Sequence, residues 1–418
     1  MAPSTTIRAF GFDDDDLLEA FVRVEDRIYR DDPIGSRLPR PDVRAQLSPR
    51  NPFFMEGGEH RSFVAFAGEE PTPEPIGRVV AMRSPRLGSD GLVGFFECVD
   101  DPAVAGALLE AAQAWLRERG VVRTLGPMNF STWYRYRFVT AGHERGPFLL
   151  EPYNPAYYGR LFEAAGFRVH NAYATLRLTH TPVPLLEAMH GRCVRHGVVF
   201  EPLDLARADD ALPMFYELSK KIFAGKTAYS AISYEEFLGL YRNASSILEP
   251  GLSWIARDAG GEALGFLFAY PDLLEPMRRG DPSSRPETTV LKTIGIVPDA
   301  PKGLGWALCH LHIVASRERG YRHGLYALME KWQELLRYAQ ADARKDQGGG
   351  GDEAVVAVAP GGCKSAKLSG RSYTSTPAAA SSSRRRCAAW KVAALVQAPA
   401  CRRRWRRSSA ASRVSPGS

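Results

Sequence analysis

The sequence predicts an α+β fold, an α/β sandwich of two similar halves, each with a mixed and mostly antiparallel sheet flanked by helices, followed by a basic tail. Three observations predict it. Apolar runs typical of strands alternate with stretches whose apolar residues recur every three or four positions, which indicates helices. The order of these stretches in the first half is repeated in the second. Towards the C-terminus, large aliphatic residues become rare while serine, alanine and arginine accumulate.

The first half covers residues 1–182 and starts with a strand in TTIRAF and a helix over Asp14–Tyr29. Three strands are expected next, in RSFVAFAG, PIGRVVAM and VGFFECV. The apolar spacing predicts a helix from Pro102 to Arg119, which Gly120 ends as a C-terminal cap. Strand VRTLGPM, a helix in NPAYYGRLFEAAG and strand AYATLRL complete this half.

The second half covers residues 183–345. Strand VVFEPL leads to helices over Ala208–Phe223 and Ser233–Leu248, and strands SWIARD and LGFLFAY follow. A strand from Thr288, a helix from Gly303 and strand RHGLYALM come next. Because this is the order of the first half, two tandem domains of one fold are predicted.

The turn before the helix at Gly303 is the strongest functional signal. It joins the strand TTVLKTIGIV to the helix GLGWALCHLHIVASRERG through PDAPK. Amides at a helix N-terminus and the positive end of the helix dipole bind phosphate oxygens. Glycine is suited to such a turn because a Cβ would keep the anion away from the backbone. The amides in question belong to Lys302, Gly303, Leu304, Gly305 and Trp306.

Two common phosphate-binding loops do not fit this turn. A Walker loop needs Lys and then Ser or Thr after its last glycine, but Trp306 follows Gly305. A dinucleotide fingerprint needs a third small residue, and Leu308 stands there. The segment resembles the acyl-CoA pyrophosphate loop of GNAT-type N-acetyltransferases instead. Ala300 and Pro301 depart from that pattern, while the matching residues are Val297, Pro298, Lys302, Gly303, Gly305, Arg319 and Gly320.

The resemblance implies that acetyl-CoA is the acyl donor and that a small amine is the acceptor. In GNAT enzymes the strand before the loop bulges, and its amides, here those of 294–297, hold the pantetheine arm and the thioester. A carboxylate near this strand commonly acts as base and a tyrosine as acid, which makes Glu287 and Tyr338 the candidates, with Tyr326 as the other phenol. The implied cofactor-binding residues are Ile296, Val297, Lys302, Gly303, Leu304, Gly305, Trp306 and Ala307.

An alternative is a GNAT-like protein that binds CoA or a partner without catalysis. It is supported by the strand itself, which carries Lys292 but no carboxylate, and by the altered Ala300-Pro301. A third class, nucleic-acid binding, depends only on the arginine-rich tail, and we expect neither a nucleic-acid partner nor a membrane partner. The sequence does not indicate the acceptor or the oligomeric state.

The first half has a resemblance of its own. GFFECVDDPAVAGALLEAA, LGPMNFS and PYNPAYYGRLFEAAGF are similar to a group of tandem GNAT-like bacterial proteins. In place of the phosphate loop, however, this half carries Asp100-Asp101-Pro102. Two carboxylates suit a helix start but repel a pyrophosphate. We therefore expect the first half not to bind CoA, and Asn154 and Tyr157, which resemble a GNAT motif near CoA, to be structural.

Composition is consistent with a cytoplasmic protein that contains no metal. The six cysteines are scattered and form no CxxC pair, and no window is apolar enough for a membrane span. Residues 346–418 are predicted to be a disordered tail, since dense like charge and few aliphatics cannot bury a core. Two further explanations are open: a reading-frame artefact in residues after about 330, and a nucleic-acid contact through Arg402–Arg407.

Overall fold

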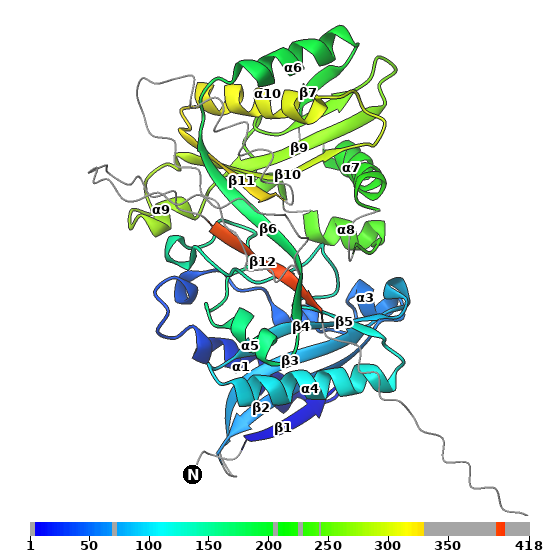
Figure 1. The fold of residues 1–418 in the computed structure, drawn as a ribbon, viewed down its shortest axis with the longest axis vertical. Coiled ribbons are helices and arrows are strands. Elements are labelled where there is room, and N and C mark those ends of the chain that lie inside the picture. Colours follow the sequence, from blue (N-terminus) through cyan, green and yellow to red (C-terminus); the bar gives the residue numbers. More distant parts are fainter. Residues whose placement is uncertain are drawn as a thin grey trace, which may run out of the picture.

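The computed structural model describes residues 5–68, 73–203, 208–224, 229–241, 244–329 and 390–397. Within them, twelve strands form one continuous sheet in the order β1-β2-β3-β4-β5-β12-β6-β11-β10-β9-β8-β7 (Figure 1). The strands are β1 Thr5–Phe10, β2 Glu59–Ala67, β3 Glu74–Arg83, β4 Asp90–Cys98, β5 Arg123–Gly126, β6 Arg168–Thr179, β7 Val199–Pro202, β8 Trp254–Arg257, β9 Ala263–Pro271, β10 Thr288–Ile296, β11 His323–Met329 and β12 Trp390–Gln397.

The helices cover both faces of this sheet. Those of the first half are α1 Asp15–Ile28, α2 Val43–Gln46, α3 Pro52–Met55, α4 Pro102–Glu118 and α5 Tyr158–Ala164. Those of the second half are α6 Pro184–Arg195, α7 Ala208–Phe223, α8 Tyr234–Tyr241, α9 Glu275–Arg278 and α10 Leu304–Glu318. Short 3₁₀ turns lie at Gly35–Arg37, Pro85–Leu87, His143–Arg145 and Ala244–Ile247.

Both halves have the predicted order of strand pairing. The strands up to β4 pair antiparallel, and β4 then pairs parallel with β5. In the second half, β7 to β10 pair antiparallel and β10 pairs parallel with β11. The helix predicted over Ser233–Leu248 is not continuous in the structure. Helix α8 covers Tyr234–Tyr241, and a separate 3₁₀ turn covers Ala244–Ile247.

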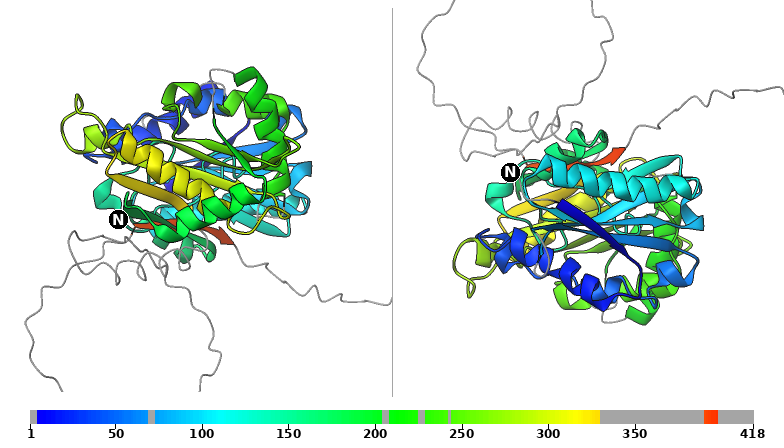
Figure 2. Two further views of the ribbon diagram at one scale, coloured as in Figure 1. Left: turned by 90° about the horizontal axis from the view of Figure 1, so that it is seen from above. Right: turned by 90° about the horizontal axis from the view of Figure 1, so that it is seen from below.

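Each half packs one apolar cluster on each face of its strands. In the second half, α6 and α10 cover one face and α7 and α8 the other. In the first half, α4 and α5 lie opposite α1 to α3. Figure 2 shows α6 beside α10 in the view from above and α4 across the first-half strands in the view from below. The sheet face covered by α7 and α8 adjoins the first half, whose Phe148 is part of the same apolar cluster.

The two halves are joined by strands that cross between them. Strand β6 belongs to the first half by residue number, but it pairs antiparallel with β11 of the second. Strand β12 pairs antiparallel with β5 and with β6. The predicted boundary after residue 182 thus places β6 in the first half by sequence, although its hydrogen bonds to β11 join it to the second half.

Within the predicted tail, residues 390–397 form β12. The run WKVAALVQ has the apolar, β-branched character of a strand, and it finds free backbone edges on β5 and β6. The rest of the tail, including Arg402–Arg407, lies outside the described residues, as does Tyr338.

Candidate functional site

Strands β10 and β11 separate halfway along β10. Their parallel pairing covers Thr288–Leu291, whereas β10 continues to Ile296 and stays paired with β9 on its other side. The register with β9 shifts between Leu291 and Thr293, so Lys292 is a bulged residue. In the described part of the chain, residues 292–296 thus have no strand partner on the β11 side. The result is an open backbone edge beside a bulge.

Helix α10 starts next to this open edge. Its N-cap is Gly303, with a φ of 94°, and no side chain caps the helix. The amide of Leu304 donates to the Pro301 carbonyl at 3.2 Å, and the amide of Ala307 to the Gly303 carbonyl at 2.9 Å. The positive end of the helix dipole is therefore not neutralised by a protein side chain, which is the condition for anion binding.

The residues predicted to bind the cofactor differ in exposure. Lys302 is exposed at the turn, and Trp306 is partly exposed one residue after Gly305. Leu304 and Ala307 are buried in the core between α10 and the sheet, so only their backbones could face a ligand. Ile296 ends β10, and the amide of Val297 already donates to the Leu264 carbonyl at 3.0 Å.

The two glycines of the turn have different surroundings. A Cβ on Gly303 would lie 2.8 Å from Sδ of Met189 on α6, and its positive φ also disfavours other residues. A Cβ on Gly305 would lie 3.7 Å from Ile294 and 3.9 Å from Ile296, which is ordinary contact. Gly303 therefore has a structural reason to be glycine, while Gly305 has none in the protein alone.

The corresponding turn of the first half is satisfied by protein groups. The Asp101 carboxylate caps α4 by accepting from the amides of Ala103 at 2.8 Å and Val104 at 3.4 Å. Asp100 pairs with Arg160 at 2.5 Å. The donors that α10 leaves without a side-chain cap are therefore occupied in α4, which gives a physical reason for the expectation that this half does not bind CoA.

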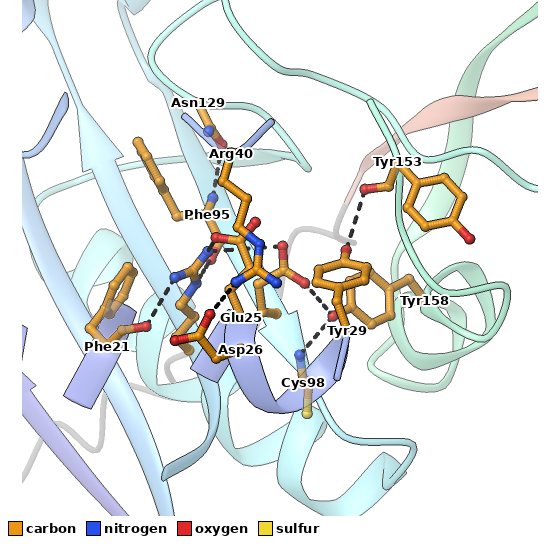
Figure 3. A network of polar contacts seen from close by, with 12 residues as sticks. Phe21, Glu25, Asp26, Tyr29, Arg40, Phe95, Cys98, Asn129, Tyr153 and Tyr158 are labelled. Atoms are coloured by element: carbon orange, nitrogen blue, oxygen red, sulfur yellow. Dashed lines mark hydrogen bonds and ion pairs between the residues drawn. The ribbon is translucent and has the colours of Figure 1, made fainter. Parts of the chain in front are cut away.

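Two tyrosines hydrogen-bond to the backbone at the C-terminal end of β4. The Cys98 amide donates to the Tyr158 hydroxyl at 3.0 Å, and the Tyr157 hydroxyl donates to the Cys98 carbonyl at 2.9 Å. Asn154 is also structural, since its side chain bonds both backbone groups of Val139. Figure 3 shows Tyr158 beside Cys98.

A buried charge network lies behind this closed strand. Arg78 pairs with Glu25 at 3.0 Å and lies 3.9 Å from Glu97, and the Tyr158 hydroxyl donates to Glu97 at 2.6 Å. Burial raises the pKa of Glu97 to about 7, although Arg78 opposes the shift. Figure 3 shows Glu25, Tyr29 and Tyr158 in this region of polar contacts.

A cavity of about 810 Å³ lies between the halves, next to the bulge of β10. Residues 292–294 of β10 and Ala327 of β11 form part of its wall. The remainder is mainly aromatic and aliphatic, and most of it comes from α7, α8, β9 and the long first-half loop that follows β5. Residues 38–41 before α2 and Tyr173 of β6 also line the first-half side. Rings on this wall include Trp133, Phe148, Phe215, Phe237, Phe266 and Phe268.

Three charged side chains meet at the wall of this cavity. The Glu151 carboxylate pairs with Arg137 at 3.0 Å, and Nζ of Lys292 lies 3.6 Å from the same Oε2 atom. Lys292 also donates to the Leu150 carbonyl at 3.0 Å. Burial lowers the pKa of Lys292 to about 8, with Glu151 opposing and Arg137 adding to the shift. Arg137 and Leu150 have φ values of 71° and 65°, a conformation that the surrounding structure must enforce.

Of the two predicted catalytic residues, Glu287 is not part of this cluster, and Tyr338 lies outside the described residues. Glu287 directly precedes β10, where it pairs with Arg279 at 3.4 Å and lies 3.9 Å from Arg322. Tyr326 is buried in the core between α10 and the sheet. Sequence reasoning missed Glu151, since nothing in the loop sequence relates it to β10. Lys292 gave a signal, because it is the one charged residue in TTVLKTIGIV.

The described residues contain no group of three or more His, Cys, Asp or Glu side chains that could hold a metal ion. No helix in the described ranges is both long enough and apolar enough to cross a bilayer.

Comparisons with known proteins give remote similarities. No family model matches the chain. The sequence is 26% identical over 267 residues to the bacterial ceramide synthase of Caulobacter vibrioides (strain NA1000 / CB15N), which covers 62% of this chain and 68% of that protein. It is 27% identical over 155 residues to Protein YghO of Escherichia coli (strain K12), covering 36% of this chain and 38% of that protein.

Solved structures of low sequence identity were also found. A tandem GNAT protein from the clavulanic acid biosynthesis pathway is 12% identical with a TM-score of 0.42, covering 81% of this chain and 94% of that one. A GCN5-related N-acetyltransferase from Sphaerobacter thermophilus is 12% identical with a TM-score of 0.40, covering 79% and 89%. In this chain itself, both halves repeat one strand order, and each has a parallel strand pair that separates beside a helix start. By this topology, the described residues form an α+β fold of two similar halves, with the strand order expected for tandem GNAT-like domains.

Proposed function

We propose that the protein is an acyl-CoA-dependent N-acyltransferase that acts on a primary amine, and that one of its two substrates carries a long apolar chain. The observation that carries the proposal is the placement of three features in the second half. All three are arranged around β10. The apolar cavity lies at its bulge, the open edge follows towards its C-terminal end, and the uncapped start of α10 comes after the strand.

Each feature suits one part of an acyl-CoA. The amides at the start of α10 and the exposed Lys302 suit the pyrophosphate, which Gly305 admits because it has no side chain. The open edge of residues 292–296 offers backbone groups to the amides of the pantetheine arm. The bulge offers a backbone N–H to the thioester carbonyl, where negative charge develops during transfer.

The cavity supports a larger apolar substrate than the small amine that the sequence alone indicated. Its volume of about 810 Å³ is within the range of about 300–1,000 Å³ typical of small-molecule sites. Its rings would exclude water from a hydrocarbon chain, at roughly 0.8 kcal/mol per buried CH₂ group. The similarity to a protein named bacterial ceramide synthase supports the same substrate class, because a ceramide is an amide of a long-chain amine.

Thiol release measures the proposed activity directly. The full chain is incubated with either acetyl-CoA or palmitoyl-CoA, and with either dodecylamine or ethylamine. We expect release of CoA thiol, and an amide detected by mass spectrometry, only where at least one substrate has a long chain. Ser219, buried on the cavity wall, provides a test of the location. Ser219→Phe should reduce turnover of the long-chain substrate at least tenfold and keep the thermal stabilisation by acetyl-CoA.

Other outcomes separate the alternatives. Equal turnover of acetyl-CoA with ethylamine would contradict the apolar-chain assignment. Thermal stabilisation by acetyl-CoA without release of thiol in any combination would favour the non-catalytic CoA-binding alternative.

A further inference from the structure

We propose that the first half supplies the carboxylate of the acyl-transfer site, and that Glu151 accepts a hydrogen bond and then a proton from the acceptor amine. The inference rests on the proposed function and adds a catalytic residue to it. It also makes the site composite, since the CoA loop belongs to one half and the base to the other.

The position of Glu151 is the first argument. Its carboxylate lies 3.6 Å from Nζ of Lys292, the bulged residue of β10 beside which the thioester is proposed to bind. Both residues are on the wall of the apolar cavity. Among the described residues on that wall, Glu151 is the only acidic one. A substrate chain in the cavity would thus bring its polar end to this carboxylate.

The unused oxygen of Glu151 is the second argument. The side chain is 2% exposed, and its Oε2 accepts a hydrogen bond from the Arg137 guanidinium. Oε1 is buried without a hydrogen-bond partner in the structure. A buried carboxylate oxygen without a partner costs free energy, and a donor supplied by a ligand would remove that cost.

The charges of the cluster indicate which donor fits. One carboxylate faces two basic groups, Arg137 and Lys292, so a protonated cluster already has an excess positive charge. A second ammonium group would be repelled in this buried place, whereas the N–H of a free amine is a neutral donor. The site therefore favours the nucleophilic form of the acceptor over its ammonium form.

The acyl transfer then conserves atoms, charge and electron pairs. The amine nitrogen attacks the thioester carbonyl carbon, a C–N bond forms, and Glu151 takes one proton from the nitrogen. The C–S bond breaks, and the thiolate leaves with the electron pair. It becomes the free thiol by taking the proton that Glu151 received, directly or through water. The products are an amide and CoA thiol, and Glu151 is again ionised.

The experiment compares Glu151→Gln with a matched control in the full chain. Glu25→Gln also removes a buried carboxylate that pairs with an arginine at 3.0 Å in the same half. With palmitoyl-CoA and dodecylamine, we expect Glu151→Gln to lower kcat by about 10²–10⁴-fold, the usual contribution of a general base. KM for palmitoyl-CoA and the thermal stabilisation by acetyl-CoA should stay unchanged. Glu151→Asp should restore part of the rate, and Glu25→Gln should keep it.

A binding measurement tests the inference independently of turnover. Calorimetry of dodecylamine with the wild type and Glu151→Gln should show a dissociation constant at least about fivefold weaker in the variant, because a charged acceptor is replaced by a neutral one. An unchanged dissociation constant, or a kcat loss equal to that of Glu25→Gln, would overturn the proposal. If the wild type bound dodecylamine but released no thiol, the proposed function would fail while the role of Glu151 in amine binding would stand.

Discussion

Gly305→Glu should abolish the stabilisation of the full chain by acetyl-CoA. Gly305 is the second residue of α10, and a Cβ there meets Ile294 and Ile296 only at 3.7 and 3.9 Å. The substitution thus adds a carboxylate at the helix start without a clash at Cβ. That carboxylate competes with a phosphate for the same N–H groups and repels it.

The magnitude follows from ligand linkage. A ligand at a hundredfold excess over its dissociation constant stabilises the folded state by about 2.7 kcal/mol. At about 2–4 °C per kcal/mol for 150–250 residues, the wild-type melting temperature should rise by about 5–11 °C. Gly305→Ala is the control, since it adds only a methyl group. Without ligand it should be more stable than wild type by up to about 1 kcal/mol from helix propensity.

The assay is thermal melting of each variant with and without acetyl-CoA. Gly305→Ala should keep a larger shift than Gly305→Glu. Substitution of Gly303 is a poorer test, because its φ of 94° and the 2.8 Å approach to Met189 predict a loss of stability without any ligand. A Gly305→Glu variant with the full wild-type shift would refute the reasoning, and so would a wild type without a shift.

Three further predictions concern stability. Asp101→Ala should lower the free energy of unfolding by about 1 kcal/mol, because α4 loses its cap. The rise in melting temperature caused by acetyl-CoA should stay unchanged, and a smaller rise would place CoA on the first half. Since the folded-state pKa of Glu97 is raised from 4.5 to about 7, its contribution to stability should fall as pH rises through that window. Glu97→Gln should remove this part of the slope in denaturant titrations. The pKa of Lys292 is lowered from 10.5 to about 8, so its contribution to stability should rise between pH 8 and 10.5. If the free energy of unfolding of Lys292→Met had the same slope with pH as that of the wild type, this prediction would be contradicted.

Local features were predictable from the sequence because local residues determine them. The strand, turn and glycine helix start around Gly303 are contiguous in the chain, and so is the Asp101 cap. Apolar spacing placed α4 and α7 close to their observed bounds. Repetition of one element order sufficed to predict two GNAT-like halves, since a sheet and its helices must each bury an apolar face.

The crossing of strands between the halves was not predictable. Strand β6 could pair with either half by its sequence, and its hydrogen bonds to β11 depend on which edge the fold leaves free. The same applies to β12, whose backbone pairs with β5 and β6. Backbone edges carry no sequence signature, so the tertiary structure decides which edges meet.

The charged cluster was decided by tertiary structure for a similar reason. The sequence drew attention to Glu287 because it is near the strand, yet that side chain pairs with Arg279 and Arg322 away from the cavity. Glu151 is contributed by a loop of the other half, next to Leu150, whose carbonyl receives Lys292 across 142 residues. What the sequence determined is the glycine-rich start of α10, where we propose that a phosphate binds. Only folding decided which carboxylate faces the bulge. Burial of the apolar walls of both halves brings charged residues from distant segments together, and these residues pair because they have lost contact with water.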